Sequence, residues 1–409
     1  MQNLPYDNGE IRRLTPSVAA KPLCVLLVDP SLYTAPYDAA LTEGLVSAGV
    51  TPTWATRPIR AGDRQEIPAE YVDDFFYKRS DDGGESRWRN VRKGLEHFQG
   101  LVSLVSKVFQ HKAKVVHIQW VVLPLFDALA IGVIRLFRPV VLTVHDTIPF
   151  NGERMSHLKR MGFHLPLRLA NHLISHTVTG RQHLISAGIP AEKISVIAHG
   201  PLKLHHPVAP LAADHGGDVA VPDGRPYNMV LFGEVKPYKG LDLLVEAVGL
   251  LAPDVQSRVR ITVAGRPRMD LTGIHKRIAE LGIDDCFRFD LRRLSEQDMA
   301  DLFSQADCFL FPYRQIDASG VYFLVKSLGR WLIASKVGVF AEQMDGTDDG
   351  QLVPSGDVVA LAEALHHAAV NRPQARPMDS KDSWESIGTQ TRGLYEQLLP
   401  DNKTVQVLR

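Results

Sequence analysis

The chain has 409 residues, which is long for one domain and sufficient for two domains that each bury a core. Hydrophobic residues make up 45% of it, and 46 Lys and Arg balance 46 Asp and Glu. This balance argues against a nucleic-acid-binding protein, which would carry an excess of basic residues. No apolar run approaches the roughly 20 residues that span a bilayer, and the polar N-terminus is not a signal peptide. Three cysteines without CxxC spacing fit a reducing compartment. We therefore expect a soluble, cytoplasmic protein.

The first half of the chain alternates short apolar runs with helical patterns, which is typical of a parallel sheet wrapped by helices. The runs CVLLV and VVLTV are apolar throughout and suit strands that are buried on both faces. Strands are predicted at 23–28, 53–56, 115–120, 140–145, 173–178 and 194–198. Helices are predicted between them, for example at 39–48, 124–137 and 156–170.

A Pro-, Gly- and Asp-rich segment without any period, residues 206–225, predicts a linker between two domains, 1–205 and 226–380. The second half then repeats the alternation of strands and helices. Strands are predicted at 229–232, 260–264, 286–289, 307–311 and 331–335, and helices at 241–251, 270–281, 295–305, 321–328 and 358–368.

Two strand-to-helix corners in the second half combine glycine with a helix start. The first reads GEVKPYKG and contains Gly233, Lys236, Lys239 and Gly240, and the second contains Ser319-Gly320-Val321. Helix N-termini attract anions through their free N–H groups and their dipole, and the lysines add positive charge. The two corners therefore predict a bound diphosphate. Ordinary surface lysines and a plain helix cap at Ser319 are the alternatives.

This pair of corners resembles the retaining glycosyltransferases of family 4, most closely over residues 227–365 and less in the first half. The resemblance implies the GT-B fold, an α/β architecture of two Rossmann-like parallel-sheet domains that face a central cleft. It also implies that the first domain binds the acceptor and the second the nucleotide sugar. A C-terminal helix at about 383–399 would cross back to the first domain.

Three positions depart from the family pattern. Glu234 stands where many members have arginine, and Val325 stands where many have a second glutamate that grips the ribose. The loop DPSLYTAPY replaces a glycine pair after the first strand.

Three residues are predicted to take part in catalysis, the first two from the resemblance. His145 matches a histidine that lies against the donor sugar, and Asp317 matches the carboxylate that orients the sugar hydroxyls. Lys239 is placed to stabilise the charge that develops on the leaving diphosphate. A core histidine is the alternative for His145.

Further residues are predicted around the nucleotide. Arg266 and Arg292 each follow a predicted strand and can reach the same cleft, or they are surface charges. Glu342 matches a family position near the nucleotide, with a solvated helix carboxylate as the alternative. No DxD motif or His/Cys cluster has metal-ligand spacing, so metal-independent chemistry is expected, with a UDP- or GDP-linked donor as substrate and no cofactor.

Acceptor contacts are predicted at the carboxyl ends of the N-terminal strands: Tyr33, Thr34, Tyr37, His117 and Asp146. Residues 86–180 carry thirteen Lys and Arg against four Asp and Glu. Within them, RWRNVRKGLEHFQGLVSLVSKVF mixes cations with Trp and Phe at helical spacing. Such a segment lies on an anionic membrane, or it is an ordinary amphipathic helix packed on its sheet.

These features predict a glycosyltransferase that moves a sugar with retention to a saccharide or polyprenyl-linked acceptor, as in exopolysaccharide synthesis. Its location would be cytoplasmic, with peripheral attachment to the inner face of the plasma membrane. Two rival functions remain: another sugar-nucleotide enzyme of the same fold, such as an epimerase, and a non-catalytic subunit that binds a nucleotide sugar or a partner enzyme.

Overall fold

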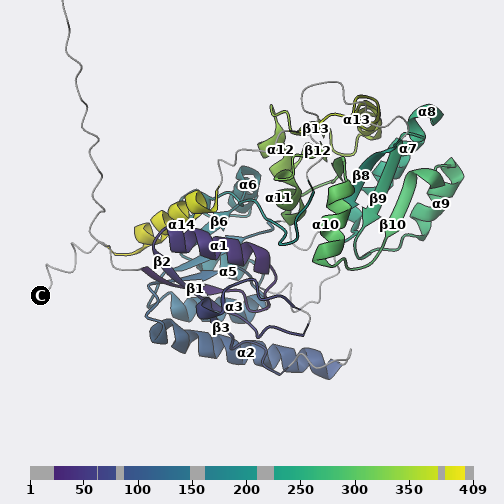
Figure 1. Ribbon diagram of the computed structural model, residues 1–409. Coiled ribbons are helices and arrows are strands. Elements are labelled where there is room, and N and C mark those ends of the chain that lie inside the picture. The colour runs from purple at the N-terminus through teal and green to yellow at the C-terminus, as the bar shows by residue number, and fades with distance from the viewer. Residues whose placement is uncertain are drawn as a thin grey trace, which may run out of the picture.

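The protein forms two α/β domains that lie side by side, each around its own parallel sheet (Figure 1). The computed structural model describes residues 23–61, 63–79, 87–147, 162–209, 225–375 and 383–400, with the backbone alone for 87–90. The strand order is β3-β2-β1-β4-β5-β6-β7 in the N-terminal sheet and β10-β9-β8-β11-β12-β13 in the C-terminal sheet. All pairs within both sheets are parallel, which confirms the predicted fold class.

The strands of the N-terminal sheet are β1 (Leu23–Val28), β2 (Val50–Ala55), β3 (Val72–Asp73), β4 (Val115–Ile118), β5 (Val140–Val144), β6 (His172–Ser175) and β7 (Ile194–Val196). The helices around it are α1 (Ala35–Ser47), α2 (Arg87–Gln110), α3 (Pro124–Ile134), α5 (His164–Leu169) and α6 (Val178–Ser186), with the 3-10 turns η1 (Ala69–Tyr71) and η3 (Ala191–Lys193).

The strands of the C-terminal sheet are β8 (Tyr227–Phe232), β9 (Val259–Ala264), β10 (Phe287–Asp290), β11 (Cys308–Phe311), β12 (Trp331–Ser335) and β13 (Gly350–Val353). Its helices are α7 (Leu241–Gly249), α8 (Pro253–Gln256), α9 (Thr272–Leu281), α10 (Glu296–Gln305), α11 (Gly320–Lys326), α12 (Gly338–Met344) and α13 (Val358–Asn371), with the 3-10 turns η4 (Pro237–Lys239) and η5 (Asp284–Cys286). A last helix, α14 (Trp384–Leu398), follows.

Both faces of each sheet are covered, because successive side chains of a strand point to opposite faces. In β1, Leu26 and Val28 pack into the core beneath α2 and α3. Val25 and Leu27 pack into a second core beneath α1 and α14. The unbroken apolar runs of the sequence therefore serve two cores at once.

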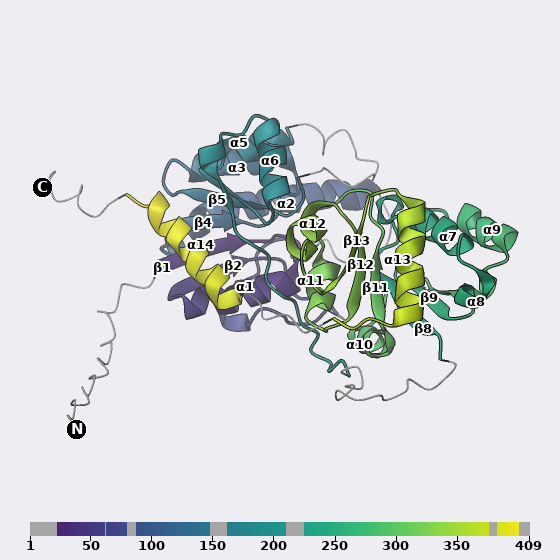
Figure 2. The ribbon, with the colours of Figure 1, turned by 90° about the horizontal axis from the view of Figure 1, so that it is seen from above.

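Helix α14 follows the last helix of the C-terminal domain, α13, and returns to pack on α1 of the N-terminal domain (Figure 2). It crosses α1 at Gly44 and Gly388, where a Cβ on Gly44 would stand 2.1 Å from the Trp384 carbonyl oxygen. A Cβ on Gly388 would stand 1.9 Å from the Gly44 oxygen. Two glycines thus allow the helices to approach closely. The Trp384 indole N–H donates to the Pro201 carbonyl at 2.8 Å.

Several predicted boundaries shift for local reasons. Helix α1 begins at Ala35, four residues early, because Pro36 suits the first helical turn. The predicted strand 173–178 runs too far, since Thr177 caps α6 by accepting from the Gly180 N–H. Part of the predicted helix 156–170, up to residue 161, and residues 210–224 of the predicted linker lie outside the described residues.

Within the described ranges, no helix combines the length and apolar character needed to cross a bilayer.

Candidate active site

The first predicted phosphate corner is a close-packed turn at the carboxyl end of β8. Gly233 and Gly265 have φ values of 98° and 135°, and a Cβ on Gly265 would stand 2.3 Å from the Gly233 oxygen. A Cβ on Gly240 would stand 2.0 Å from the Pro312 oxygen. Positive φ and close backbone contact both demand glycine. These glycines bring the loops after β8, β9 and β11 together.

The two predicted corners lie beside each other. A Cβ on Gly233 would stand 3.2 Å from a Val321 methyl group at the start of α11. Ser319 caps α11 by accepting from the Tyr322 N–H at 3.4 Å, and the space next to Gly320 is open. The structure therefore brings Gly233, Ser319, Gly320 and Val321 to one place, where a ligand can approach the backbone.

Lys239 lies deeper than the sequence analysis expected. Its side chain is 4% exposed, its Nζ donates to the Phe232 oxygen at 2.8 Å, and it lies 5.4 Å from the Tyr313 ring centroid. Burial, reinforced by the charge of Lys236, lowers the pKa of Lys239 to about 7. Lys239 is thus not a fully charged residue on the rim in the ligand-free protein, and the expectation of a full positive charge there is corrected.

Acidic residues neutralise two of the other predicted cations. Glu234 lies 3.3 Å from the Lys236 ammonium and accepts from Arg268 at 2.8 Å. Arg292 is held by Asp290 at 2.9 Å and Asp298 at 2.8 Å, both within its own loop and helix start.

Arg266 is exposed at the carboxyl end of β9, and its backbone oxygen accepts from Val235 at 2.9 Å. Arg266 is therefore exposed beside the glycine turn, whereas the Arg292 guanidinium forms ion pairs with two carboxylates at the surface.

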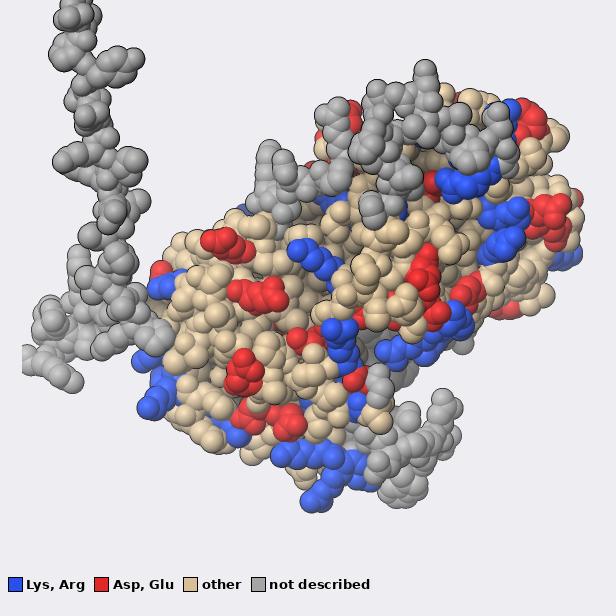
Figure 3. Space-filling model, in the orientation of Figure 1, with Lys and Arg blue, Asp and Glu red and all other residues tan. Residues whose placement is uncertain are grey.

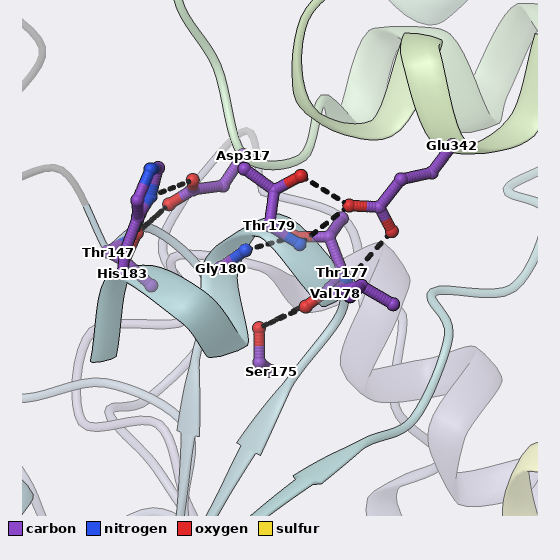
Figure 4. A network of polar contacts seen from close by, with 9 residues as sticks. All are labelled: Thr147, Ser175, Thr177, Val178, Thr179, Gly180, His183, Asp317 and Glu342. Carbon is purple, nitrogen blue, oxygen red and sulfur yellow. Dashed lines mark hydrogen bonds and ion pairs between the residues drawn. The ribbon is translucent and has the colours of Figure 1, made fainter. Parts of the chain in front are cut away.

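Asp317 reaches from the C-terminal domain into the N-terminal one. It is 4% exposed, and its carboxylate accepts from the Thr147 N–H at 2.5 Å and from the Thr147 hydroxyl. Its other oxygen lies 3.1 Å from His183 Nδ1 in α6. The Asp317 carboxylate therefore points toward Thr147, in the loop that follows His145, and toward His183 (Figure 4).

Glu342 makes a second contact between the domains. From α12 it accepts from the N–H groups of Val178 and Thr179 at 2.8 and 2.7 Å, and from the Thr179 hydroxyl at 2.6 Å (Figure 4). A carboxylate is favoured at the positive end of a helix dipole and satisfies its free donors. Glu342 thus caps α6 across the junction.

His145 follows β5 and lies at the edge of the N-terminal sheet that faces the other domain. It is partly buried and stacks on Trp120, with ring centroids 4.8 Å apart and planes 8° apart. Its Nε2 is 3.1 Å from the Gln119 amide oxygen, and its Nδ1 is 3.3 Å from His176 Nε2. The Nδ1 of His176 lies 3.0 Å from the Ile197 oxygen, which can only accept, so this nitrogen carries the proton of the His176 ring.

Two residues that the sequence analysis missed, His176 and His199, complete this edge. They follow β6 and β7, and His199 stacks on Phe323 of α11, with centroids 4.0 Å apart. Burial lowers the pKa of His176 to about 4 and of His199 to about 3, and it holds the pKa of His145 well below its usual value. All three rings are therefore neutral at pH 7. His199 directly follows the predicted strand 194–198, which was a usable signal, whereas the predicted strand 173–178 ran past His176 and hid it.

The predicted acceptor residues divide into two groups. Tyr33 is 56% exposed and lies 5.5 Å from Trp120, whose indole donates to the Thr34 hydroxyl at 2.9 Å. Asp146 is partly buried beside His145.

The other two predicted acceptor residues are enclosed. Tyr37 belongs to α1 and is buried among His145, His176 and His199. His117 is 1% exposed, and its ring nitrogens meet the Tyr395 hydroxyl of α14 at 2.6 Å and the Thr143 hydroxyl at 2.7 Å. The predictions for Tyr37 and His117 are therefore corrected. Both side chains are buried and pack beneath the residues at the carboxyl edge of the N-terminal sheet, so neither offers a free surface to an acceptor.

Among the described residues, no group of three or more His, Cys, Asp or Glu is placed to hold a metal ion.

Two family models match the chain, one in each domain. Residues 39–200 match Glycosyltransferase Family 4, and residues 226–371 match Glycosyl transferases group 1. The D-inositol 3-phosphate glycosyltransferase of Saccharomonospora viridis is 30% identical over 166 residues. That match spans 37% of this chain and 37% of that relative.

Solved structures share the whole fold at low sequence identity. HepE of Anabaena, in complex with UDP and glucose, has a TM-score of 0.60 and 16% identity, covering 94% of this chain and 99% of that one. Sucrose-phosphate synthase of Thermosynechococcus elongatus has a TM-score of 0.67 and 17% identity, covering 92% and 99%. Residues 39–200 and 226–371 are therefore each similar to a glycosyltransferase family model, and the structural relatives show that the chain has the two-domain GT-B fold.

Proposed function

We propose that this protein transfers a sugar from a nucleoside diphosphate sugar to a saccharide acceptor, with retention of configuration. The contact from Asp317 to Thr147 carries this proposal. It joins the glycine-rich corner of the C-terminal domain to the chain two residues after His145. A donor whose diphosphate lies at Gly233 and Gly320 would present its sugar at this point, between Asp317 and His145.

The chemistry of the C-terminal corner favours a diphosphate. Backbone approaches closely at Gly233, the space beside Gly320 is open, and Lys236, Lys239 and Arg266 surround the turn. HepE, one of the structural relatives, was solved with UDP and with UDP-glucose. A UDP- or GDP-linked sugar is the donor class that we propose.

In the proposed reaction, the lysines stabilise the leaving diphosphate in place of a metal ion. Asp317 and the neutral His145 hold the sugar hydroxyls. The acceptor hydroxyl attacks from the face that the diphosphate leaves, so the configuration is retained without a covalent intermediate on Asp317, whose remaining lone pairs accept from the sugar hydroxyls.

The proposed acceptor is a saccharide carried on a polyprenyl lipid, as in exopolysaccharide synthesis. Tyr33 and Trp120 offer a partly exposed aromatic pair beside His145, and a sugar ring can lie against such a surface.

Thermal-shift measurements with UDP-, GDP- and ADP-sugars test the donor, since a ligand that binds only the folded state raises the melting temperature. The donor that stabilises the protein is then incubated with saccharide acceptors, and NMR of the product gives its anomeric configuration. Inverted product would disprove retention. The absence of both stabilisation and transfer for every nucleotide sugar would disprove the function.

A non-catalytic role in nucleotide-sugar binding is the second candidate. Glu234 pairs with Lys236 and Arg268 at the very corner where a diphosphate would need free cations, and the buried Val325 offers no ribose carboxylate. This candidate predicts stabilisation by a nucleotide sugar without any turnover.

A further inference from the structure

The outer side of the N-terminal domain exposes far more apolar surface than its packing requires. Helix α2 buries one stripe, Leu101, Leu104 and Val108, against the sheet. A neighbouring stripe on α2 and the residues of α3 and just after it stay exposed by 44–76%. We call this set the apolar face: Leu95, Phe98, Val102, Phe109, Leu129 and Leu136.

Aromatic pairs join α2 and α3 into one continuous surface. Phe98 lies 5.9 Å from Phe126, and Phe109 lies 5.5 Å from Phe137, both edge to face. The guanidinium of Arg138 lies 5.7 Å from the Phe109 ring centroid. The apolar face is thus a ridge shared by two helices, with a cation resting on its edge.

Basic residues outnumber acidic ones around the apolar face, although Asp73 of β3 lies 2.7 Å from both Lys107 of α2 and His111 just after it. The acidic residues of α2, α3 and α5 are Glu96, which pairs with Arg92 at 3.3 Å, and Asp127, which is buried. Lys and Arg side chains gather along the lower edge of the molecule, where α2 lies (Figure 3). Exposed cations on and around these helices include Arg92, Lys112, Lys114, Arg135 and Arg168. The side chains of Arg87, Trp88 and Arg89 lie outside the described residues.

We infer that the apolar face docks on an anionic lipid bilayer, with its apolar side chains at the acyl boundary and its cations on lipid phosphates. Exposed aliphatic and aromatic residues flanked by Lys and Arg are what a helix lying in a membrane interface needs. A second copy of this chain fits poorly, because a two-fold contact would set the same basic surface against itself. The inference rests on the proposed function in naming a lipid-linked acceptor, but its test does not.

The position of the apolar face fits such an acceptor. In a parallel α/β layer, each helix that follows a strand begins at the carboxyl edge of the sheet. Helices α2 and α3 follow β3 and β4, so their first turns lie at the edge that carries His145. If the apolar face lies on the bilayer, a saccharide attached to a membrane lipid would need to extend only past the first turns of α2 and α3 to reach His145.

Flotation of the full chain with vesicles tests the docking surface. The protein should float with vesicles of phosphatidylcholine and phosphatidylglycerol, less at high salt because exposed charges are screened, and not with phosphatidylcholine alone. The triple variant Leu95→Ser, Leu129→Ser, Leu136→Ser should reduce the bound fraction at least about tenfold. The matched control Leu250→Ser, Val359→Ser changes residues that are both 59% exposed on the C-terminal domain, and it should bind like wild type.

Three outcomes would overturn the inference. One is wild-type protein that ignores anionic vesicles at low salt. Another is a triple variant that floats as well as the control. The third is wild type that dimerises without lipid in analytical ultracentrifugation while the triple variant stays monomeric, which would make the face a self-interface. Transfer to a water-soluble acceptor should be equal in wild type and triple variant. Failure of transfer alone, with flotation as expected, would count against the proposed function and not against the membrane surface.

Discussion

The two domains share an architecture but present opposite chemistry at the edges that meet. The edge of the N-terminal sheet carries His145, His176 and His199, whose pKa values are all lowered by burial, so the edge is neutral. The facing edge of the C-terminal sheet carries charged groups, among them Glu234 and Lys236, which are paired with each other.

This difference shows how one fold can hold a ligand with two unlike ends. Neutral rings and amides offer hydrogen bonds without net charge, which suits sugar hydroxyls. A cationic turn with close backbone suits a diphosphate. The comparison therefore predicts that changes at the first edge alter turnover and that changes at the second edge alter donor binding.

Of the changes considered, His145→Ala at the neutral edge should lower turnover the most. We expect turnover to fall at least about 100-fold, because the lost contact lies where charge develops in the transition state. Donor affinity should change little. Steady-state kinetics and calorimetry separate the two effects.

The matched control is His172→Ala, at the first residue of β6 on the opposite edge of the same sheet, which should keep its turnover. An equal loss in both variants, or a His145 variant that does not fold, would make His145 a structural residue.

Lys239→Ala tests the charged edge. Donor binding should weaken by about 1.5–3 kcal/mol, the range for a hydrogen bond to a charged group, whereas turnover at saturating donor should fall less. Calorimetry with the cognate nucleotide sugar measures the change. Lys276→Ala, an exposed lysine on α9, is the control. Unchanged affinity in Lys239→Ala would remove this lysine from the donor site.

The pH dependence of donor binding sharpens the same comparison. Free Lys239 has a pKa near 7, and a diphosphate beside it should raise that pKa, so binding should take up a proton. Affinity should therefore fall by up to about tenfold per pH unit above pH 7, until the pKa of the complex is reached. Calorimetry in buffers of different ionisation enthalpy measures the uptake.

The uptake should vanish in Lys239→Ala. The same lowered pKa also affects folding stability. Between about pH 7 and 10.5 the Lys239 side chain is protonated in the unfolded chain but neutral in the folded protein. The free energy of unfolding should therefore rise with pH over this range. A proton uptake that persists in the variant would assign the titration to another group.

The smallest expected effect is that of a chelator. If lysines take the place of a metal at the charged edge, excess EDTA should leave the transfer rate unchanged in a product-release assay. Loss of activity that magnesium or manganese restores would show that transfer needs a divalent cation and would contradict the proposed role of the lysines.

The sequence by itself determined the fold class and the glycine-rich corners. Apolar runs such as CVLLV are long enough to serve both faces of a buried strand, and this pattern is local. Gly233 and Gly240 mark turns with φ of 98° and 69°, a backbone demand that is also local. Element boundaries were less well predicted: Pro36 starts α1 four residues before the predicted start, and the Thr177 cap of α6 ends β6 before the predicted strand end.

Only the tertiary structure decided which side chains meet. His145, His176 and His199 follow three different strands, and the parallel register of β5, β6 and β7 brings them together. The burial of Lys239 depends on Tyr313, which comes from another strand end. Glu342 caps a helix that lies 163 residues earlier in the chain. Such contacts follow from how strands pair and domains pack, and no local period or turn residue encodes them. The apolar face has the same origin, because only the packing of α2 and α3 shows which apolar stripe is left uncovered.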